Sequence, residues 1–494
     1  MRSIRTHKPL VYSGRIKIKP DTHLRKWLLL PLLLCIAIIG NSTLALAKTT
    51  YTINSTTNTN FEIYYGAEIT LTQMIATEVA AQLWSELLAD DVTIKLFVTT
   101  TNHMPRGVLG SATVEKLVSE TPYQNFLSKL SAGKKSLNDK IAYKNLQKGN
   151  NGEASELSVM VNERVLSGID DIQLARANAK ALELLPSNDL NFDGHIVLNK
   201  LSNSSSGIPL TWSYNLTSNQ IPSDTLDFLS MAVHEIGHTL GFISGVDNPN
   251  LQLAIKNDKT RGIPIEESVV EDSITPLDLY RFSNQSKDKI VLGDNYSLIT
   301  MGIPDLSPGK VAFTTFDLGL SKVEYMSTGD TTLGGDGNQA SHWNQDKNAV
   351  MEPYLRTGQR EAIASADLIA FDLIGWDVRS EAKSLNQLGA ILPSLYERAK
   401  ATAEYKLANS STWILIDPPL LVNPITLDVN NTQNNNVDDS DDVDDLTPLS
   451  AYSQDSALAE VCNNSQNNNT SHCILWRTSG FGKWREYYGQ LGLR

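Results

Sequence analysis

Apolar residues between Leu71 and Leu88 recur with the period of an α-helix that buries one face. They occupy positions 71, 74, 75, 79, 83, 84, 87 and 88. Two aspartates interrupt this pattern, and from Val92 to Val98 apolar residues then alternate with others, as they do in a half-buried strand. The pattern therefore predicts a helix over 71–88 that is followed directly by a strand over 92–98.

Similar patterns predict the other elements of the chain. Residues 113–185 are expected to be mostly helical, with breaks at Gly149–Gly152 and near Gly168. The order of helices and strands up to about residue 241 indicates an α/β subdomain, within a chain of the α+β class. The remaining expected elements are a short strand at Ile196–Leu198, a helix from Ser223 or Asp224 to about Leu240, a strand around Val311–Phe316, a helix from its N-cap Ser365 to Gly375, and a helix from Pro393 to about Lys406.

The first 47 residues have the pattern of a secretory signal peptide. A basic stretch ends at Arg25 and Lys26, an uncharged apolar run extends from Trp27 to Gly40, and small residues lead up to Ala47. Cleavage after Ala47 predicts a secreted, extracellular chain, with the periplasm or a cell surface as alternatives. The 14-residue apolar run is short for a membrane span, so an uncleaved anchor is the less favoured interpretation. No later segment approaches about 18 apolar residues, so no membrane span is expected once the leader is removed.

Charge divides the chain into two unlike parts. Residues 1–26 contain eight of the 42 basic residues and one of the 55 acidic residues, and residues 27–47 contain no charge. The rest of the chain therefore carries 34 basic and 54 acidic residues, a net charge of −20, although the whole chain has only −13. Because binding to phosphates needs a basic surface, this excess of acid argues against nucleic acid as a partner.

The C-terminal part of the chain is predicted to lie beyond the main domain. A helical extension is expected over 381–427, followed by an acidic Asn/Asp-rich linker over 428–447 that has almost no apolar residues. Residues 448–494 are expected to form a small module. Within it, Cys462 and Cys473 are predicted to form a disulfide, because cysteines of exported chains usually pair.

The segment His234-Glu235-Ile236-Gly237-His238 carries the strongest chemical signal. Histidines four positions apart on a helix lie one above the other, so both imidazoles can reach one metal ion. Glu235 is then placed to contact a water molecule on that ion and to take its proton as the water attacks a carbonyl group. These residues predict one catalytic zinc ion that is bound by His234 and His238, with Glu235 as the general base.

A catalytic zinc site needs a third protein ligand. After the motif comes Gly241, which can adopt a positive φ and end the helix in a sharp turn. The contiguous pattern HExxHxxGxxH would place the third ligand at Ser244, a poor zinc ligand, so the ligand must come from elsewhere. Asp247 and Asp278 are two acidic candidates. The other histidines after the leader are His103, His195, His342 and His472.

Two later segments give the chain a resemblance to a known family. They are Ala340-Ser341-His342-Trp343 and Val350-Met351-Glu352-Pro353, and the predicted helix over 365–375 follows them. Together with HExxHxxG, this order resembles the leishmanolysin-like branch of the metzincin zinc proteases, in which an inserted segment displaces the third histidine. The resemblance implies that His342 is the third zinc ligand, ahead of Asp247 and other groups, and that Met351 is the methionine of the Met-turn beneath the metal.

The resemblance also implies a fold. A two-lobed catalytic domain is expected over 48–380, with a mixed sheet and the active-site helix in an N-terminal lobe that ends at about 241. The C-terminal lobe, 242–380, would be irregular, with a long insertion over 243–341, the Met-turn and a C-terminal helix. Some metzincins use a tyrosine just after the Met-turn to stabilise the oxyanion. Tyr354 stands one position later than that pattern, so a surface tyrosine is the alternative interpretation.

A second, weaker motif lies at Asp189, Asn191 and Asp193, which match the first half of a calcium-binding loop. Lys200 stands where such a loop would need a glutamate. A turn made by Asx side chains, leading into the strand at Ile196, is therefore favoured, and a Ca²⁺ site is the alternative.

These patterns favour one function. The sequence predicts a secreted, monomeric zinc metalloendopeptidase that acts on protein or peptide substrates. A secreted zinc-containing binding or adhesion protein on an inactive protease scaffold is the alternative, and a zinc hydrolase of non-peptide amides would share the same site. The presence of Glu235 favours an active enzyme, because loss of this residue is the commonest lesion of an inactive one.

Overall fold

The computed structural model describes residues 59–421, except for 103, 105–107, 117–120, 149–155, 202–209, 293–297, 318–321, 345–348 and 380–384. The described part contains ten α-helices and a mixed five-stranded sheet, which confirms the α+β class. Within it, no helix combines the length and the apolarity needed to cross a membrane. The predicted leader, acidic linker, C-terminal module and disulfide between Cys462 and Cys473 all lie outside the described residues.

The main sheet has the strand order β16-β1-β2-β8-β3. Its central strands are β1 (Asn60–Gly66), β2 (Thr93–Thr101) and β8 (Gly194–Asn199), which run parallel to one another. The short edge strand β16 (Ile414–Leu415) is parallel to β1. At the opposite edge, β3 (Gly110–Val114) is antiparallel to β8.

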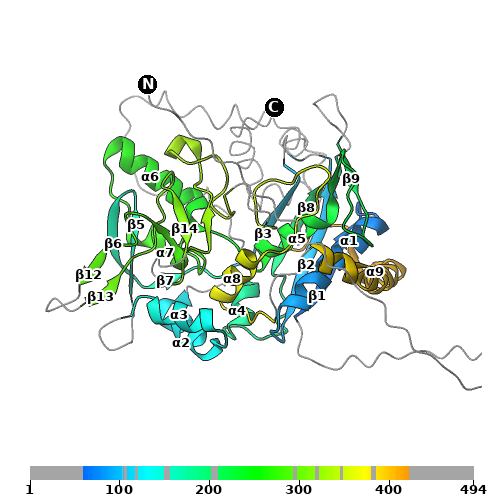
Figure 1. The fold of residues 1–494 in the computed structure, drawn as a ribbon, viewed down its shortest axis with the longest axis horizontal. Helices are drawn as coiled ribbons and strands as arrows, with labels where there is room; N and C mark the ends of the chain where they lie inside the picture. The colour runs from blue at the N-terminus through cyan, green and yellow to red at the C-terminus, as the bar shows by residue number, and fades with distance from the viewer. Residues whose placement is uncertain are drawn as a thin grey trace, which may run out of the picture. The chain divides into compact units, whose positions relative to one another are not determined.

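Helices cover one face of this sheet. Helix α1 (Leu71–Leu87), which begins at a capping box, lies against α5 (Phe228–Thr239), and the Trp84 indole donates a hydrogen bond of 3.0 Å to the Val233 carbonyl of α5. Helix α9 (Leu385–Ala408) packs along the outer side of α1 (Figure 1). Helix α8 (Ser365–Leu373) closes this first hydrophobic core, whose members include Ile63, Leu96, Val79, Leu229, Ile236, Phe371, Leu392 and Ala399.

A second hydrophobic core lies away from the sheet. It is built from α2 (Tyr123–Gly133), α3 (Leu137–Asn145), the hairpin of β5 (Leu157–Val161) and β6 (Arg164–Ile169), and α6 (Pro249–Arg261). The buried members of this core come from both sides of residue 241, so the predicted lobe boundary does not separate the two cores. The shorter elements are β4 (Thr121–Pro122), β7 (Asp171–Ile172), α4 (Arg176–Ala181), β9 (Thr211–Ser213), β10 (Thr225–Asp227), α7 (Glu267–Glu271), β11 (Arg281–Ser283), β12 (Ile290–Leu292), β13 (Leu298–Met301), β14 (Ala312–Thr314), β15 (Glu324–Met326) and α10 (Ser410–Trp413).

Several predicted elements agree with the structure. Helix α1 and strands β2, β8 and β14 form where the hydrophobic pattern indicates them. Helix α8 also forms as expected, although its N-cap is Ala364 rather than Ser365. Gly375, with φ of +106°, ends that helix as expected.

The prediction of mostly helical structure over 113–185 is wrong, because this segment contains the β5–β6 hairpin as well as β4 and β7. The hairpin turn is formed by Asn162 and Glu163, which both have positive φ angles, of 49° and 68°. Two such residues form the tight turn that suits a two-residue hairpin loop. A turn without glycine gives a weak sequence signal, which explains the error.

Two predicted helix starts are also wrong. Helix α5 begins at Phe228, because Asp227 rather than Ser223 or Asp224 caps it by accepting a hydrogen bond of 3.1 Å from Ser230 N. Helix α9 begins eight residues before Pro393 and continues through it. Proline removes one backbone hydrogen bond inside a helix, and burial of the nearby Leu392 and Leu395 side chains offsets that cost.

Candidate metal centre

Three histidines meet at the end of α5. His234 and His238 lie one turn apart on the helix, with their Nε2 atoms 3.0 Å apart. His342 comes from the segment before the predicted Met-turn, and its Nε2 lies 3.2 Å from that of His234 and 3.3 Å from that of His238. In the described part of the chain, this is the single group of three or more His, Cys, Asp or Glu residues whose ligand atoms lie close enough together to hold a metal ion.

The arrangement of the three rings fits a metal ion. Nitrogen ligands at about 2.0–2.1 Å from a tetrahedral zinc ion lie about 3.3–3.4 Å apart, close to the observed separations. Each Nδ1 faces a backbone carbonyl, which is Val350 O at 2.7 Å for His234, Phe242 O at 2.8 Å for His238, and Gln339 O at 3.2 Å for His342. Because a carbonyl only accepts, each Nδ1 carries the proton, and three Nε2 lone pairs converge on one point. A cation at that point satisfies all three.

Burial keeps these rings neutral. It lowers the pKa of His234 to about 4 and that of His238 to about 3, and it lowers the pKa of His342 well below its usual value. The neighbouring histidines act in the same direction on His238 and His342. Since only neutral imidazole binds a metal ion, protons do not compete for this site near neutral pH.

Glu235 lies on the side of α5 that faces the edge strand β3. A Cβ atom at Gly110 of β3 would stand 2.9 Å from Glu235 Cδ, so the carboxylate lies directly against the strand backbone. Glu235 is buried, which raises its pKa to about 8. Among the described residues no group forms a hydrogen bond with this carboxyl group, so both of its oxygens are available to a water molecule or a substrate.

Met351 packs against α5 between His234 and His238. A Cβ atom at Gly237, between the two helical ligands, would stand 2.6 Å from Met351 Sδ, so the methionine packs against the helix that carries them. The preceding carbonyl, Val350 O, holds the Nδ1 of His234. Asp367 of α8 holds the backbone at Val350 and Met351. It accepts hydrogen bonds from Val350 N, Met351 N and the Trp343 indole.

The turn after α5 agrees with the prediction for Gly241. This residue has a φ of +110°, and the helix ends just before it. An added Cβ would stand 3.2 Å from Asn178 Cβ and 3.3 Å from Ile374 Cδ1, so a side chain has little room there. Glycine at this position both reverses the chain and lets it pass close to α4 and α8.

The two acidic candidates for the third ligand have other partners. Asp247 accepts hydrogen bonds from the backbone N–H groups of Ala340 and Ser341, at 2.7 Å each. Asp278 accepts from Gly245 N at 2.7 Å and from Ser244 Oγ at 2.6 Å. Neither belongs to the metal-binding group, which contains His342 instead.

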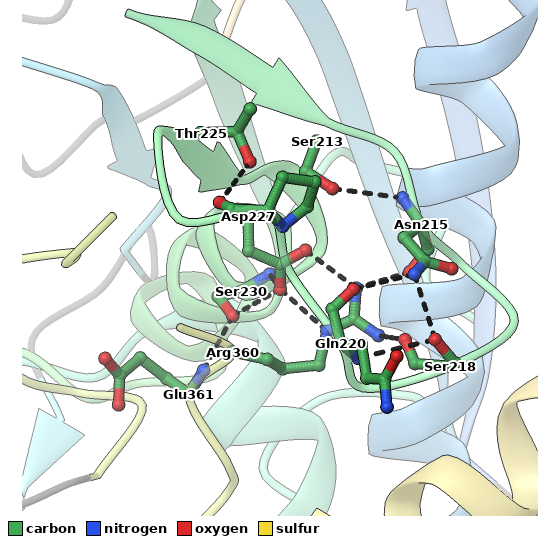
Figure 2. Close-up of polar contacts among 10 residues, drawn as sticks. Ser213, Asn215, Ser218, Gln220, Thr225, Asp227, Ser230, Arg360 and Glu361 are labelled. Atoms are coloured by element: carbon green, nitrogen blue, oxygen red, sulfur yellow. Dashed lines mark hydrogen bonds and ion pairs between the residues drawn. The ribbon is translucent and has the colours of Figure 1, made fainter. Parts of the chain in front are cut away.

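The start of α5 is held by a contact that the sequence does not reveal. Arg360 forms a two-pronged ion pair with Asp227, with Nε 2.8 Å from Oδ2 and Nη2 2.7 Å from Oδ1 (Figure 2). The same guanidinium donates to the carbonyls of Asn215 and Ser218. The backbone N–H of Glu361, the residue after Arg360, donates to Ser230 Oγ in α5. Asp227 precedes a predicted helix, which is a usable signal for a cap, but no pattern marks Arg360 as its partner.

The remaining candidates do not join the metal centre. Tyr354 is half-buried, and within the described residues no hydrogen bond or ring contact joins it to the three histidines. Burial raises its pKa and the Asn338 side chain opposes that rise, which places the phenol beside the 336–338 segment. His195 is buried in β8 between the rings of Phe97 and Phe192. His103 and His472 lie outside the described residues.

The predicted calcium loop has protein cations as partners. Asp193 pairs with Lys180 at 2.6 Å, and Asp189 pairs with Arg176. Asp189 Oδ1 also accepts a hydrogen bond of 3.0 Å from Asn191 N, which is the geometry of an Asx turn. These contacts support the turn, and the two carboxylates are neutralised without a calcium ion.

The site is thus a group of three buried, neutral histidines that can hold a metal ion, with an unbonded glutamate beside it on the same helix. Comparisons with protein-family models, with curated proteins and with solved structures give no match to this chain.

Proposed function

We propose that this chain is a zinc-dependent metalloendopeptidase. The observation that carries the proposal is the convergence of three Nε2 atoms, 3.0–3.3 Å apart, on one point beside the free carboxylate of Glu235. Three neutral histidines are a common ligand set of catalytic zinc and leave a fourth position open. Structural zinc sites instead use four protein ligands, and no fourth ligand belongs to this group among the described residues.

The residues of the chain have distinct roles in this proposal. His234, His238 and His342 would hold the zinc ion, which when bound supplies Lewis acidity toward a carbonyl oxygen and makes a water molecule more acidic. Glu235 takes the proton of the attacking water as its oxygen bonds to the carbonyl carbon of the substrate. The same carboxyl group then delivers that proton to the amine nitrogen as the C–N bond breaks.

Strand β3 supports a peptide as the substrate, rather than a small non-peptide amide. It is the last strand of its sheet, so the backbone groups along its outer edge are free of a sheet partner in the described structure. An extended peptide can add to such an edge through main-chain hydrogen bonds. Since Gly110 of this strand lies against the Glu235 carboxylate, a peptide paired there runs past the general base.

The fold and the order of motifs support membership of the leishmanolysin-like branch of the metzincins. His342 comes 104 residues after His238 and closes the metal site, and Met351 packs beneath the helix that carries the first two ligands. The basic leader with its apolar run supports secretion of this enzyme.

Replacement of Glu235 by alanine tests the proposal. The Glu235→Ala variant should bind one zinc ion per chain, as the wild type does, because the three histidines are untouched. Its cleavage of a denatured protein substrate should fall by at least about 10²–10⁴-fold, the range that a general base contributes. Glu183→Ala, which removes an exposed carboxylate, serves as the control and should leave cleavage unchanged.

The outcome separates the alternatives. Retained proteolysis in Glu235→Ala would exclude the proposed mechanism. A wild-type protein that binds zinc but cleaves no peptide in a library would favour the binding or adhesion protein on an inactive scaffold.

A further inference from the structure

The third ligand of the metal centre lies on irregular backbone. His234 and His238 are fixed by a helix, whereas His342 lies outside any helix or strand. The next residue, Trp343, pairs with Met326 in a single isolated β-bridge. The chain travels 104 residues from His238 before it returns with His342. Closing so long a loop costs conformational entropy, so contacts at its end must hold the returning segment in place.

Asp247 makes these contacts on the N-terminal side of His342. Its Oδ1 accepts a hydrogen bond of 2.7 Å from Ala340 N. Its Oδ2 accepts two more, from Ser341 N at 2.7 Å and from Ser341 Oγ at 2.5 Å. One carboxylate therefore receives three donors from the two residues that precede the ligand.

Asp247 is itself fixed to the end of α5. It is the last residue of a 3-10 turn, Gly245–Asp247, that begins four residues after the helix-ending Gly241. Asp278 holds this turn by accepting from Gly245 N and from Ser244 Oγ, and Ser244 N donates to Ser341 Oγ at 2.9 Å. The helix that carries two ligands and the carboxylate that holds the third thus form one continuous structure.

Contacts on the other side of His342 come from different segments. The His342 carbonyl accepts from Ser327 N at 3.0 Å, and Trp343 N donates to Met351 O at 3.0 Å. Neither contact involves the residues that follow α5. Ser341 Oγ also accepts from Ser244 N, and the Phe242 ring lies against that of Trp343, but Asp247 is the side chain after α5 that receives three hydrogen bonds from the segment before His342.

We propose that Asp247 is a positioning residue that sets the place of His342 and so determines the metal affinity of the centre. This inference rests on the proposed metal site, but it does not depend on which reaction the site catalyses. Residues that orient metal ligands typically change metal affinity or activity by about 10–100-fold when they are replaced. Loss of the carboxylate leaves two backbone N–H groups without their acceptor, and the turn that carries His342 shifts away from the other two rings.

The test measures zinc affinity directly, by competition with a chromophoric chelator, in purified wild-type protein and in Asp247→Ala. The zinc dissociation constant of the variant should rise by about 10–100-fold. Cobalt(II) should give a visible absorption spectrum in the variant that differs from the wild-type spectrum, because the spectrum reports the ligand set. In Asp247→Asn one acceptor oxygen remains, so both effects should be smaller but in the same direction.

Asp139→Asn is the matched control. Asp139 is also a buried aspartate that accepts backbone hydrogen bonds, from Lys135 N and Ser136 N at 3.1 Å each, but it lies at the start of α3, and its side-chain neighbour is Asp372 at the far end of α8 from Asp367. The Asp139→Asn variant should have a lower free energy of unfolding than the wild type, with the same zinc dissociation constant and the same cobalt spectrum.

Two outcomes would overturn the inference. One is a zinc dissociation constant in Asp247→Ala within twofold of the wild type. The other is an equal loss of affinity in Asp139→Asn, which would mean that any buried aspartate matters equally. Should Asp247→Ala fail to fold, Asp247→Asn decides by the same criteria. Failure of the proposed peptidase would appear separately, as absent cleavage by a wild type that binds zinc tightly.

Discussion

Gly237 and Met351 lie against each other at the centre of the site, where the absence of a side chain at 237 leaves room for the methionine. Alanine is about 1 kcal/mol more favourable than glycine inside a helix, so a glycine in the middle of α5 needs another explanation. The explanation is the thioether of Met351, which is fully buried and occupies the space where a side chain at 237 would lie. Absence of a side chain at this position lets the Met-turn approach the helix between its two metal ligands.

We therefore expect Gly237→Ala to destabilise the protein and the metal site together. The added Cβ would stand 2.6 Å from Met351 Sδ and 3.4 Å from Trp84 Cζ2, so buried side chains must move. Overpacking of this kind costs about 1–3 kcal/mol in free energy of unfolding. Urea unfolding and zinc stoichiometry would measure the two effects.

Gly133→Ala provides the control for this substitution. Gly133 lies in the last turn of α2, and an added Cβ there meets no atom within 4 Å. Alanine should be neutral there, or stabilising by up to about 1 kcal/mol. Equal effects of the two substitutions would show that the contact with Met351 has no energetic importance.

The sequence predicted the three histidines of the candidate metal site better than it predicted the residues that hold them in place. His234 and His238 follow from helical spacing alone, and His342 follows from its resemblance to a known order of motifs. The supports, such as Asp367 and Gly110, act through contacts between segments that are far apart in the chain. Hydrophobic periodicity carries no information on such contacts.

Helix α5 is held at both of its ends by aspartates. Asp227 caps its start and binds Arg360 (Figure 2), and Asp247 follows its end and binds the segment before His342. Asp227 and Arg360 are 133 residues apart in the chain, and Asp247 and Ser341 are 94 residues apart. Helix α5, which carries His234, Glu235 and His238, is thus fixed to the segments that contain Arg360 and His342.

Removal of Arg360 should destabilise the protein strongly. The side chains of Arg360 and Asp227 are 1% and 0% exposed, so Arg360→Met leaves a buried carboxylate without its ion pair. Breaking a buried pair from one side costs about 3–5 kcal/mol. We expect a fall of this size in the free energy of unfolding, measured by urea titration followed by circular dichroism.

Two further variants give this expectation its control. Arg398→Met breaks an exposed pair with Glu86 and should cost at most about 1 kcal/mol. The double variant Asp227→Asn with Arg360→Met should lose less than the sum of the two single variants, because each single variant leaves one buried charge unpaired and the double variant leaves none. Additive losses would argue that the two side chains act independently.

The elements that the sequence located well are those that bury one regular face. Helix α1 and strand β2 do so, and their boundaries agree closely with the prediction. Errors arise where several local signals compete, as they do for Ser223, Asp224 and Asp227 before α5. Tertiary packing decides between them, because only Asp227 has an arginine partner.

The first hydrophobic core extends beyond the predicted catalytic domain, which was expected to end at 380. Helix α9 contributes Leu388, Leu392, Leu395, Ala399 and Ala403 to this core, and β16 adds a strand to the sheet beside β1. Lys406 of α9 donates to Glu78 Oε1 at 2.6 Å and to Ile63 O at 2.9 Å. These contacts make residues 385–415 part of the unit that holds α1, and α1 in turn packs against α5.

A chain that ends at residue 380 should therefore fail to form the metal site, whereas one that ends at 421 should keep it. The shorter chain exposes the apolar face of α1 and leaves Glu78 with Tyr65 as its partner, at 2.7 Å, but without the lysine that neutralises it. Removing one member of such a buried ion pair costs about 3–5 kcal/mol, before the loss of the apolar contacts of α9 is added. Zinc stoichiometry and the urea midpoint of the two purified chains measure the difference, and Lys406→Met in the full chain reports the ion pair alone. A stable, zinc-binding chain that ends at 380 would restore the predicted boundary and show that α9 is not needed for the metal site.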